Sequence, residues 1–251
     1  MNAARDGSDD DSPSVRAPVI TVDGPGGTGK GALCGLIADW LGWHLLDSGA
    51  LYRLLAAVAL KSQIDPGSDN GADNSEAELA EMASALDPEF RAVPGVEGLA
   101  VWLAGVDWTG DIRTEACGAV ASKIAAFPAV RAALLARQRA FQRLPGLIAD
   151  GRDMGTVVFP DAELKIFLTA DSDERALRRH KQLIGKGIDV NLAQLSKDIA
   201  DRDRRDSERP VSPLKPADDA VVIDTTSLSI EGVSLRARTL VEARGLQNIS
   251  I

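Results

Sequence analysis

The sequence predicts an α/β fold: a P-loop core with a five-stranded parallel sheet and helices on both faces. Short apolar runs alternate with segments of helical period, which is the order expected of parallel strands joined by crossover helices. The first run leads into a glycine-rich turn and then into a helix pattern that Gly42 ends. The predicted core strands are residues 18–22, 43–46, 146–150, 164–168 and 220–223.

Helices are predicted where apolar residues recur every three or four positions. In the core, one such pattern begins at residue 50 and another covers residues 229–244. Two further helices, over 172–184 and 192–206, are rich in arginine, and we expect them to form a short lid.

A large α+β insert interrupts this order. Its first segment, 65–75, is rich in Asp, Gly, Asn and Ser and predicts a loop. Ser75 and Glu78 form a candidate capping box for a helix over 76–86. An antiparallel hairpin with its turn at residues 94–98 and two helices then complete the insert. The hairpin strands are predicted at 89–93 and 99–103, and the helices at about 114–126 and 128–144.

These patterns divide the chain into a leader, a discontinuous core, an insert and a lid. The leader is polar and acidic, and we expect it to be disordered. The divisions are the leader (1–16), three core segments (17–61, 146–171 and 213–251), the insert (62–145) and the lid (172–212).

Composition excludes several classes of function. The net charge of −9 argues against bulk binding to nucleic acid or to an anionic membrane. No apolar run approaches the ~20 residues that cross a bilayer, and the N-terminus lacks the apolar segment of a signal peptide. Cys34 and Cys117 fall in helix-like segments without metal-ligand spacing, so we expect buried free thiols and a cytoplasmic location. If such an acidic protein binds polyphosphates, its arginines must be concentrated locally.

The strongest functional signal is the run Gly24-Pro25-Gly26-Gly27-Thr28-Gly29-Lys30-Gly31. It matches the pattern GxxxxGK between a predicted strand and a predicted helix, as a phosphate-binding loop requires. Glycines let backbone N–H groups surround a phosphate, and the helix N-terminus adds its dipole. Lys30 would supply a mobile positive charge to the β- and γ-phosphates. A plain glycine-rich turn is the alternative, which the placement of Lys30 disfavours.

The residues after Lys30 narrow the class. A Ser or Thr that holds Mg²⁺ usually follows this lysine, but here Gly31 and Ala32 follow. A loop ending in Gly-Lys-Gly resembles that of the nucleoside monophosphate kinases, in which a Thr usually comes next. Ala32 departs from that pattern.

Two more polar clusters follow predicted strands, where open parallel sheets bind ligands. Ser48 could donate to a phosphate, and Arg53, about one helical turn further on, could grip it with two hydrogen bonds. A helix cap and a surface arginine would explain the same two residues. Asp150 ends an apolar strand like a carboxylate that holds Mg²⁺ through water, and Arg152 and Asp153 follow it.

Taken together, these motifs resemble those of the bacterial cytidylate kinases over nearly all of residues 17–244. The resemblance rests on the loop, on the unusual length of the insert and on four runs, at 46–53, 125–131, 150–160 and 202–209. It implies a kinase that transfers the γ-phosphoryl group of ATP to CMP or dCMP, with Mg²⁺ as cofactor and the insert binding the monophosphate. We expect a monomer whose partners are these small molecules.

Carried over position by position, the resemblance assigns roles to individual residues. It implies that residues 24–32, including Pro25, Thr28 and Ala32, form the ATP loop. Lys30, Arg152 and Arg209 would be catalytic, and Arg209, reaching toward the phosphates, would also belong to the CMP-binding residues. The CMP phosphate would be bound by Ser48, Arg53 and Arg152. The base would be bound by Ser122, Arg131 and Asp153, and the ribose by Arg202 and Asp206.

Arginine spacing in the two lid helices fits this assignment. Arg175, Arg178 and Arg179 share one face of the first helix, and arginines recur about once per turn in the second. A solvated face with paired charges explains the first helix equally well. For the second helix we favour function, because transfer between two anions needs concentrated positive charge.

Three other functions stay open. One is a P-loop kinase for another small acceptor, such as UMP, AMP or a polyol. Another is a switch of the GTPase type, which would need an Asn-Lys-x-Asp run that the sequence lacks. The third is a nucleotide-binding module without catalysis.

Overall fold

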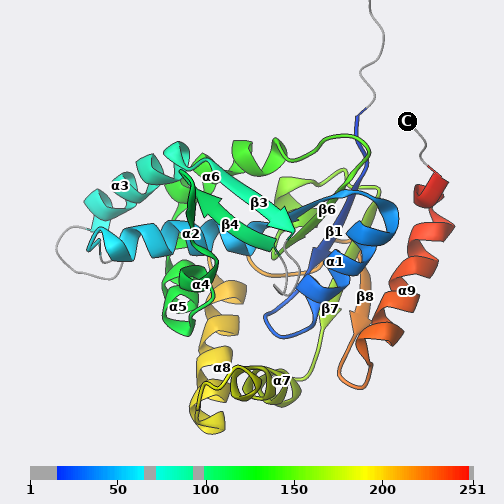
Figure 1. Ribbon diagram of the computed structural model, residues 1–251. Helices are drawn as coiled ribbons and strands as arrows, with labels where there is room; N and C mark the ends of the chain where they lie inside the picture. The colour runs from blue at the N-terminus through cyan, green and yellow to red at the C-terminus, as the bar shows by residue number, and fades with distance from the viewer. Residues whose placement is uncertain (1–15, 65–71, 93–98, 249–251) are drawn as a thin grey trace, which may run out of the picture.

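The computed structural model describes residues 16–64, 72–92 and 99–248 and confirms the predicted fold class. Five parallel strands form one sheet in the order β2-β6-β1-β7-β8, with helices against both faces (Figure 1). Each strand differs from its predicted range by one residue at one or both ends. They are β1 (Val19–Asp23), β2 (His44–Asp47), β6 (Leu147–Gly151), β7 (Leu164–Thr169) and β8 (Val221–Asp224).

Strand register brings the polar clusters of the sequence to one edge of the sheet. Asp23 at the end of β1 pairs with Gly151 on β6, and Asp150 on β6 pairs with Asp47 at the end of β2. Three segments therefore leave the sheet side by side: the glycine-rich loop after β1 (residues 24–31, here called the phosphate loop), the segment after β6 and the start of the helix after β2. This is the carboxyl edge, where open α/β sheets bind ligands.

Both faces of the sheet are buried, which explains the uninterrupted apolar runs of its strands. On one face, α1 (Lys30–Leu41) and α9 (Ile230–Ala243) bury Leu33, Ile37 and Val233 against β1, β6 and β7. Gly42 ends α1 in the left-handed conformation, with φ of 67°. The other face is covered by residues that include Leu51 and Met154.

The segment predicted as an insert packs around a second hydrophobic core, which it shares with α2. β3 and β4 pair antiparallel, as predicted, although the turn between them lies outside the described residues. A third strand, β5, extends this small sheet. The elements around this core, which α2 also joins, are α2 (Ser48–Lys61), α3 (Ala72–Ala85), β3 (Pro88–Ala92), β4 (Leu99–Leu103), β5 (Val106–Asp107), α4 (Thr109–Ile112), α5 (Glu115–Ile124) and α6 (Pro128–Arg139).

Two helix boundaries in the insert were predicted wrongly. α3 begins at Ala72, so Ser75 lies inside the helix and cannot be its cap. Its opening residues are polar types that favour turns and helix starts alike, so their composition indicated a loop. α6 ends at Arg139 rather than near 144, because the chain turns there and Phe141 packs edge-on against Phe90 of β3. The rest of the predicted loop (65–71) and the predicted leader, apart from Arg16, lie outside the described residues.

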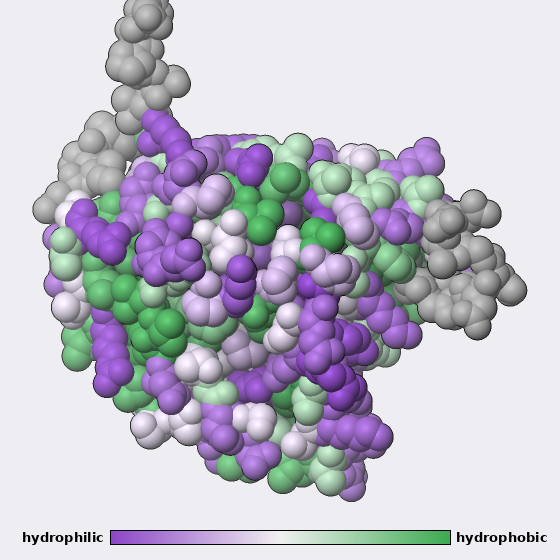
Figure 2. All heavy atoms as spheres, turned by 180° about the vertical axis from the view of Figure 1, so that it is seen from behind, coloured by the Kyte–Doolittle hydropathy of each residue, from purple (hydrophilic) through white to green (hydrophobic). Residues whose placement is uncertain are grey.

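The segment predicted as a lid contains α7 (Ser172–Gly185) and α8 (Leu192–Glu208), and the last described element is a 3-10 turn, η2 (Leu246–Asn248). From behind, hydrophilic side chains gather over the part of the molecule that contains α8 (Figure 2). In the described part of the chain, no single helix is long and apolar enough to cross a membrane. Only α5 and α6 taken together, bent by 102°, reach the required length and composition.

Candidate functional site

A pocket at the carboxyl edge of the sheet lies between core, insert and lid. All nine residues predicted to bind CMP line it. Among the residues that the structure describes, five arginines face this pocket together with two aspartates, so positive charge is concentrated in an otherwise acidic protein. The full lining is Ser48, Gly49, Tyr52, Arg53, Ala121, Ser122, Ala125, Arg131, Gly151, Arg152, Asp153, Arg202, Asp206 and Arg209.

The phosphate loop connects β1 to α1 beside this pocket. The Thr28 hydroxyl and the Lys30 ammonium both donate to the Pro25 carbonyl, at 3.0 and 2.8 Å, which closes the loop on itself. Gly24 must be glycine, because a Cβ there would lie 2.1 Å from the Leu168 carbonyl oxygen. In the described chain, no side chain caps α1 and its first turn has no acidic residue. Its first N–H groups are thus suited to an anion.

Lys30 and Asp150 are two buried titratable residues next to the loop. Burial lowers the pKa of Lys30 and the nearby Arg152 lowers it further, whereas Asp150 opposes that shift. Burial raises the pKa of the Asp150 carboxyl, against the attraction of Lys30. Burial therefore disfavours the charged forms of both groups, and their mutual attraction opposes this effect. With little water present, a bound phosphate would be attracted strongly by the Lys30 ammonium.

Asp150 fits a metal ion held through water. Among the described residues, no group of three or more His, Cys, Asp or Glu side chains could hold a metal directly. One Asp150 oxygen lies 3.7 Å from the position that a Cβ on Gly31 would take, so it faces the start of α1. A single hard carboxylate oxygen there suits Mg²⁺, which keeps several of its waters when bound.

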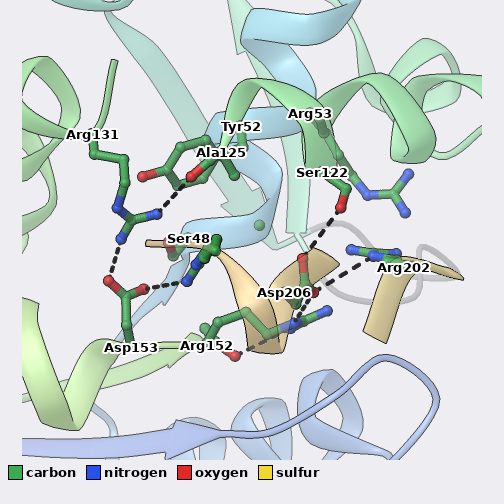
Figure 3. Close-up of a pocket in the computed structure, with 14 residues that line it drawn as sticks. Ser48, Tyr52, Arg53, Ser122, Ala125, Arg131, Arg152, Asp153, Arg202 and Asp206 are labelled. Carbon is green, nitrogen blue, oxygen red and sulfur yellow. Dashed lines mark hydrogen bonds and ion pairs between the residues drawn. The ribbon is translucent and has the colours of Figure 1, made fainter. Parts of the chain in front are cut away.

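Asp206 of α8 joins the lid to the insert and to the segment after β6 (Figure 3). It accepts from the Ser122 hydroxyl at 3.2 Å and from Arg152 Nε at 3.2 Å, and Arg202 Nε lies 3.9 Å away. Burial alone would raise the pKa of Asp206, but the surrounding arginines hold it below its usual value.

Arg152 and Arg202 both reach the phosphate loop. Their guanidinium nitrogens lie 3.7 and 3.8 Å from the position of a Cβ on Gly26. Burial, together with Arg152 and Arg53, lowers the pKa of Arg202 to about 10. Like charges are therefore crowded at a point where an anion would relieve their repulsion.

Asp153 is the second carboxylate of the pocket. It forms a buried ion pair with Arg131, and Arg209 Nη2 lies 3.8 Å from its other oxygen. Arg131 also donates to the Ala125 carbonyl at 3.1 Å, and its guanidinium lies 5.7 Å from the centre of the Tyr52 ring. Asp153 is therefore held firmly in the pocket lining by two arginines.

Ser48 and Arg53, which follow β2, were open to two interpretations: phosphate-binding residues, or a helix cap and a surface arginine. The helix cap exists, but Asp47 provides it by accepting from the Ala50 N–H at 2.9 Å. Ser48 is buried and donates to Gln138 at 2.7 Å. Arg53 is not a surface arginine: it lines the pocket and donates to the carbonyls of Ile112 and Thr114.

Several site residues escaped the sequence analysis. Tyr52 lines the pocket, and Gln138 binds Ser48 from a helix that is distant in sequence. Asp23, at the end of β1, accepts from the N–H groups of Met154 and Gly155 at 2.9 and 2.8 Å. The position of Asp23 directly before the glycine run was a signal that could have identified it. Nothing in the sequence indicates the contacts of Tyr52 and Gln138, because the fold creates them.

The arginines of α7 have partners within the protein. Arg175 is buried against the phosphate loop, Arg178 donates to the carbonyls of Thr225 and Thr226, and Arg179 pairs with Glu115 of the insert. Only Arg175 departs from a face of paired charges: Arg178 and Arg179 are partly exposed and pair with Glu174 and Glu115, and none of the three lines the described pocket. Arg202 of α8 and Arg209, directly after α8, line the pocket, whereas Arg205 is absent from the described lining.

A phosphate loop at the carboxyl edge of a parallel sheet, beside an arginine-lined pocket, defines the chain as a P-loop nucleotide-binding protein. The family model described as cytidylate kinase matches residues 20–242. The chain belongs to this family, as its motifs indicated.

Curated relatives named cytidylate kinase support the same assignment. The protein of Aeromonas hydrophila subsp. hydrophila is 57% identical over 217 residues, which are 86% of this chain and 90% of that protein. The Klebsiella pneumoniae protein is 57% identical over 224 residues, with coverages of 89% and 95%. That of Pseudomonas savastanoi pv. phaseolicola is 55% identical over 232 residues, with coverages of 92% and 98%.

Proposed function

We propose that this member of the cytidylate kinase family transfers the γ-phosphoryl group of ATP to CMP or dCMP through the two anion sites described above. The observation that carries the proposal is their adjacency: Arg152 and Arg202 of the pocket reach Gly26 of the phosphate loop. An acceptor phosphate held by these arginines would lie directly beside the terminal phosphate of ATP. That arrangement supports transfer between two nucleotides rather than binding of one nucleotide alone.

On the donor side, residues 24–32 would hold the triphosphate. Backbone N–H groups of the loop and of the first turn of α1 would bind its oxygens, and Lys30 would exchange the Pro25 carbonyl for the β- and γ-phosphates. Family membership implies a divalent metal with ATP, and we propose Mg²⁺, with Asp150 binding one of its waters. The metal would neutralise charge on the β- and γ-phosphates.

On the acceptor side, Arg53 and Arg152 would bind the CMP phosphate together with Ser48. The cytosine ring would lie at the inner end of the pocket, near Asp153, Arg131 and Ser122. Asp206, with Arg202, would meet the ribose. We include in this proposal the division of the chain into core, insert (62–145) and lid (172–212), because the pocket draws residues from all three.

The chemistry follows from this charge distribution. The attacking phosphate oxygen is already anionic at neutral pH, so transfer needs no strong general base. The enzyme must instead bring two anions together in line and exclude water. Lys30, Arg152 and Arg209 would supply the positive charge, and closure of the lid would exclude the water that hydrolyses ATP.

The test is a coupled assay of ADP release across CMP, dCMP, UMP and AMP. We expect turnover with CMP and dCMP well above that with UMP or AMP. A preference for UMP or AMP would identify a related kinase, and ATP binding without acceptor-dependent ADP formation would identify a non-catalytic module. We further propose a monomer. We also propose a cytoplasmic location, which the two free, buried thiols Cys34 and Cys117 favour.

A further inference from the structure

We propose that Arg175 is a positioning residue: with Asp203 it transmits the state of the phosphate loop to the arginine helix α8. Arg175 lies in the first turn of α7 and is 4% exposed. It is outside the pocket, so it is not expected to touch CMP. The inference rests on the proposed function, which it extends from the substrate contacts to the coupling between the two sites.

Three hydrogen bonds fix the Arg175 guanidinium. Nε donates to the Ala170 carbonyl at 3.1 Å, Nη1 to the Gly26 carbonyl at 3.1 Å, and Nη2 to Asp203 at 2.5 Å. One planar group thus joins the segment after β7, the phosphate loop and α8. A lysine could not make these bonds together, because it lacks the forked geometry of arginine.

The contact with the loop is close. Gly27 has a φ of 82°, and a Cβ there would lie 3.1 Å from the Cβ of Arg175. The first turn of α7 therefore rests directly on the loop that would carry the triphosphate. Any rearrangement of Gly26 and Gly27 on nucleotide binding would act on Arg175.

On the other side, Asp203 stands among the α8 residues of the pocket. Arg202 precedes it, and Asp206 follows one turn later. Arg202 itself approaches Gly26, at 3.8 Å from the position of a Cβ. The Arg175–Asp203 pair thereby fixes α8 relative to the loop. Ordering of the loop should therefore order α8, which carries Arg202 and Asp206 of the proposed CMP site.

A matched control lies two residues away on the same helix. Asp201 also pairs with an arginine, Arg204, at 2.7 Å, but that partner belongs to α8 itself and is exposed. Asp201→Ala removes the same charge from α8 without touching the contact with the loop. The informative variants are Asp203→Ala, Arg175→Lys and their combination.

The first measurement is steady-state kinetics with both substrates. Losing a hydrogen bond between charged groups should raise KM for CMP about ten-fold in Asp203→Ala, with a much smaller change in KM for ATP. Arg175→Lys should raise KM for CMP at least as much, because it also loses the bonds to Ala170 and Gly26. Adding Asp203→Ala to it should cause little further increase, because the Arg175–Asp203 pair is already lost. Additive effects, or an Asp201→Ala variant that matches Asp203→Ala, would overturn the proposal.

The second measurement does not depend on turnover. Hydrogen exchange of the α8 amides is compared with and without a non-hydrolysable ATP analogue. The analogue should slow exchange in α8 in the wild type and in Asp201→Ala, but only in the phosphate loop in Asp203→Ala and Arg175→Lys. If the analogue slowed exchange of the α8 amides equally in all four proteins, the proposal would be refuted. A wild type without CMP turnover would refute the proposed function while leaving this readout decisive.

Discussion

In the proposed CMP site, Asp153 would combine a fixed position with chemical selectivity. Its carboxylate is buried, paired with Arg131 and close to Arg209. Cytosine offers an exocyclic amine where uracil offers a carbonyl, so a group that only accepts hydrogen bonds suits cytosine. The same carboxylate would repel the carbonyl of uracil.

We predict that Asp153→Asn narrows the preference for CMP over UMP, measured as the ratio of kcat/KM values. A shift of about ten-fold is expected from one hydrogen bond to a charged group. Asp206→Asn is the control, because it should weaken both monophosphates alike. Unchanged discrimination in a folded Asp153→Asn protein would place the base-reading residue elsewhere.

Ala32 is the residue at which the loop departs from the expected pattern. It is exposed in the first turn of α1, so a larger side chain has room there and Ala32 has no packing role. We predict that Ala32→Thr folds normally and lowers KM for ATP, by up to about ten-fold for one charge-assisted hydrogen bond. KM for CMP should change little. Paired kinetics at saturating Mg²⁺ provide the check, and an unchanged or higher KM for ATP would refute a phosphate contact at this position.

At the scale of elements, burial decided which parts were predictable. The five core strands are covered on both faces, so their apolar runs were clear in the sequence. The one-turn π-helix η1 (Met154–Val158) was not predicted. Two of its first N–H groups are bonded by Asp23, 131 and 132 positions earlier in the chain, and no local pattern records such a contact.

Asp23, which links β1 to η1, should make the stability of the fold depend on pH. Burial raises its pKa to about 6, even though the two N–H groups and Lys30 oppose the shift. Because the unfolded carboxyl titrates near 3.8, the folded state binds more protons than the unfolded state between about pH 4 and pH 6. The stability contributed by Asp23 is thus present below that window and is lost as pH rises through it.

We predict that the free energy of unfolding of Asp23→Asn, relative to wild type, increases by about 2 kcal/mol between about pH 4.5 and pH 7. Urea denaturation at both pH values measures this change. Any constant cost of the lost hydrogen bond cancels in the comparison. A relative stability that does not change with pH would mean that Asp23 titrates normally in the folded protein.

At the scale of the whole molecule, an acidic protein presents a strongly basic pocket. The net charge is −9, yet Arg53, Arg131, Arg152, Arg202 and Arg209 face one pocket between core, insert and lid. The motifs predicted these residues individually, and the fold brings them together. Sequence could not supply their partners, such as Gln138 for Ser48, because those contacts join segments that are far apart along the chain.

We propose that donor and acceptor phosphates occupy two separate but adjacent sites, the loop and the arginine pocket. Arg152 belongs to the pocket side, where it is bonded to Asp206. Lys30 belongs to the loop side, and we propose that it acts on the transferred group. Lys30→Met should then lower kcat at least ~100-fold, as loss of one strong electrostatic group does.

The most direct test is therefore the pair of KM values of Arg152→Ala. With one charged hydrogen bond to the acceptor lost, KM for CMP should rise about ten-fold or more while KM for ATP changes far less. Equal increases in both KM values, or a larger increase for ATP, would contradict the assignment of the pocket to the monophosphate.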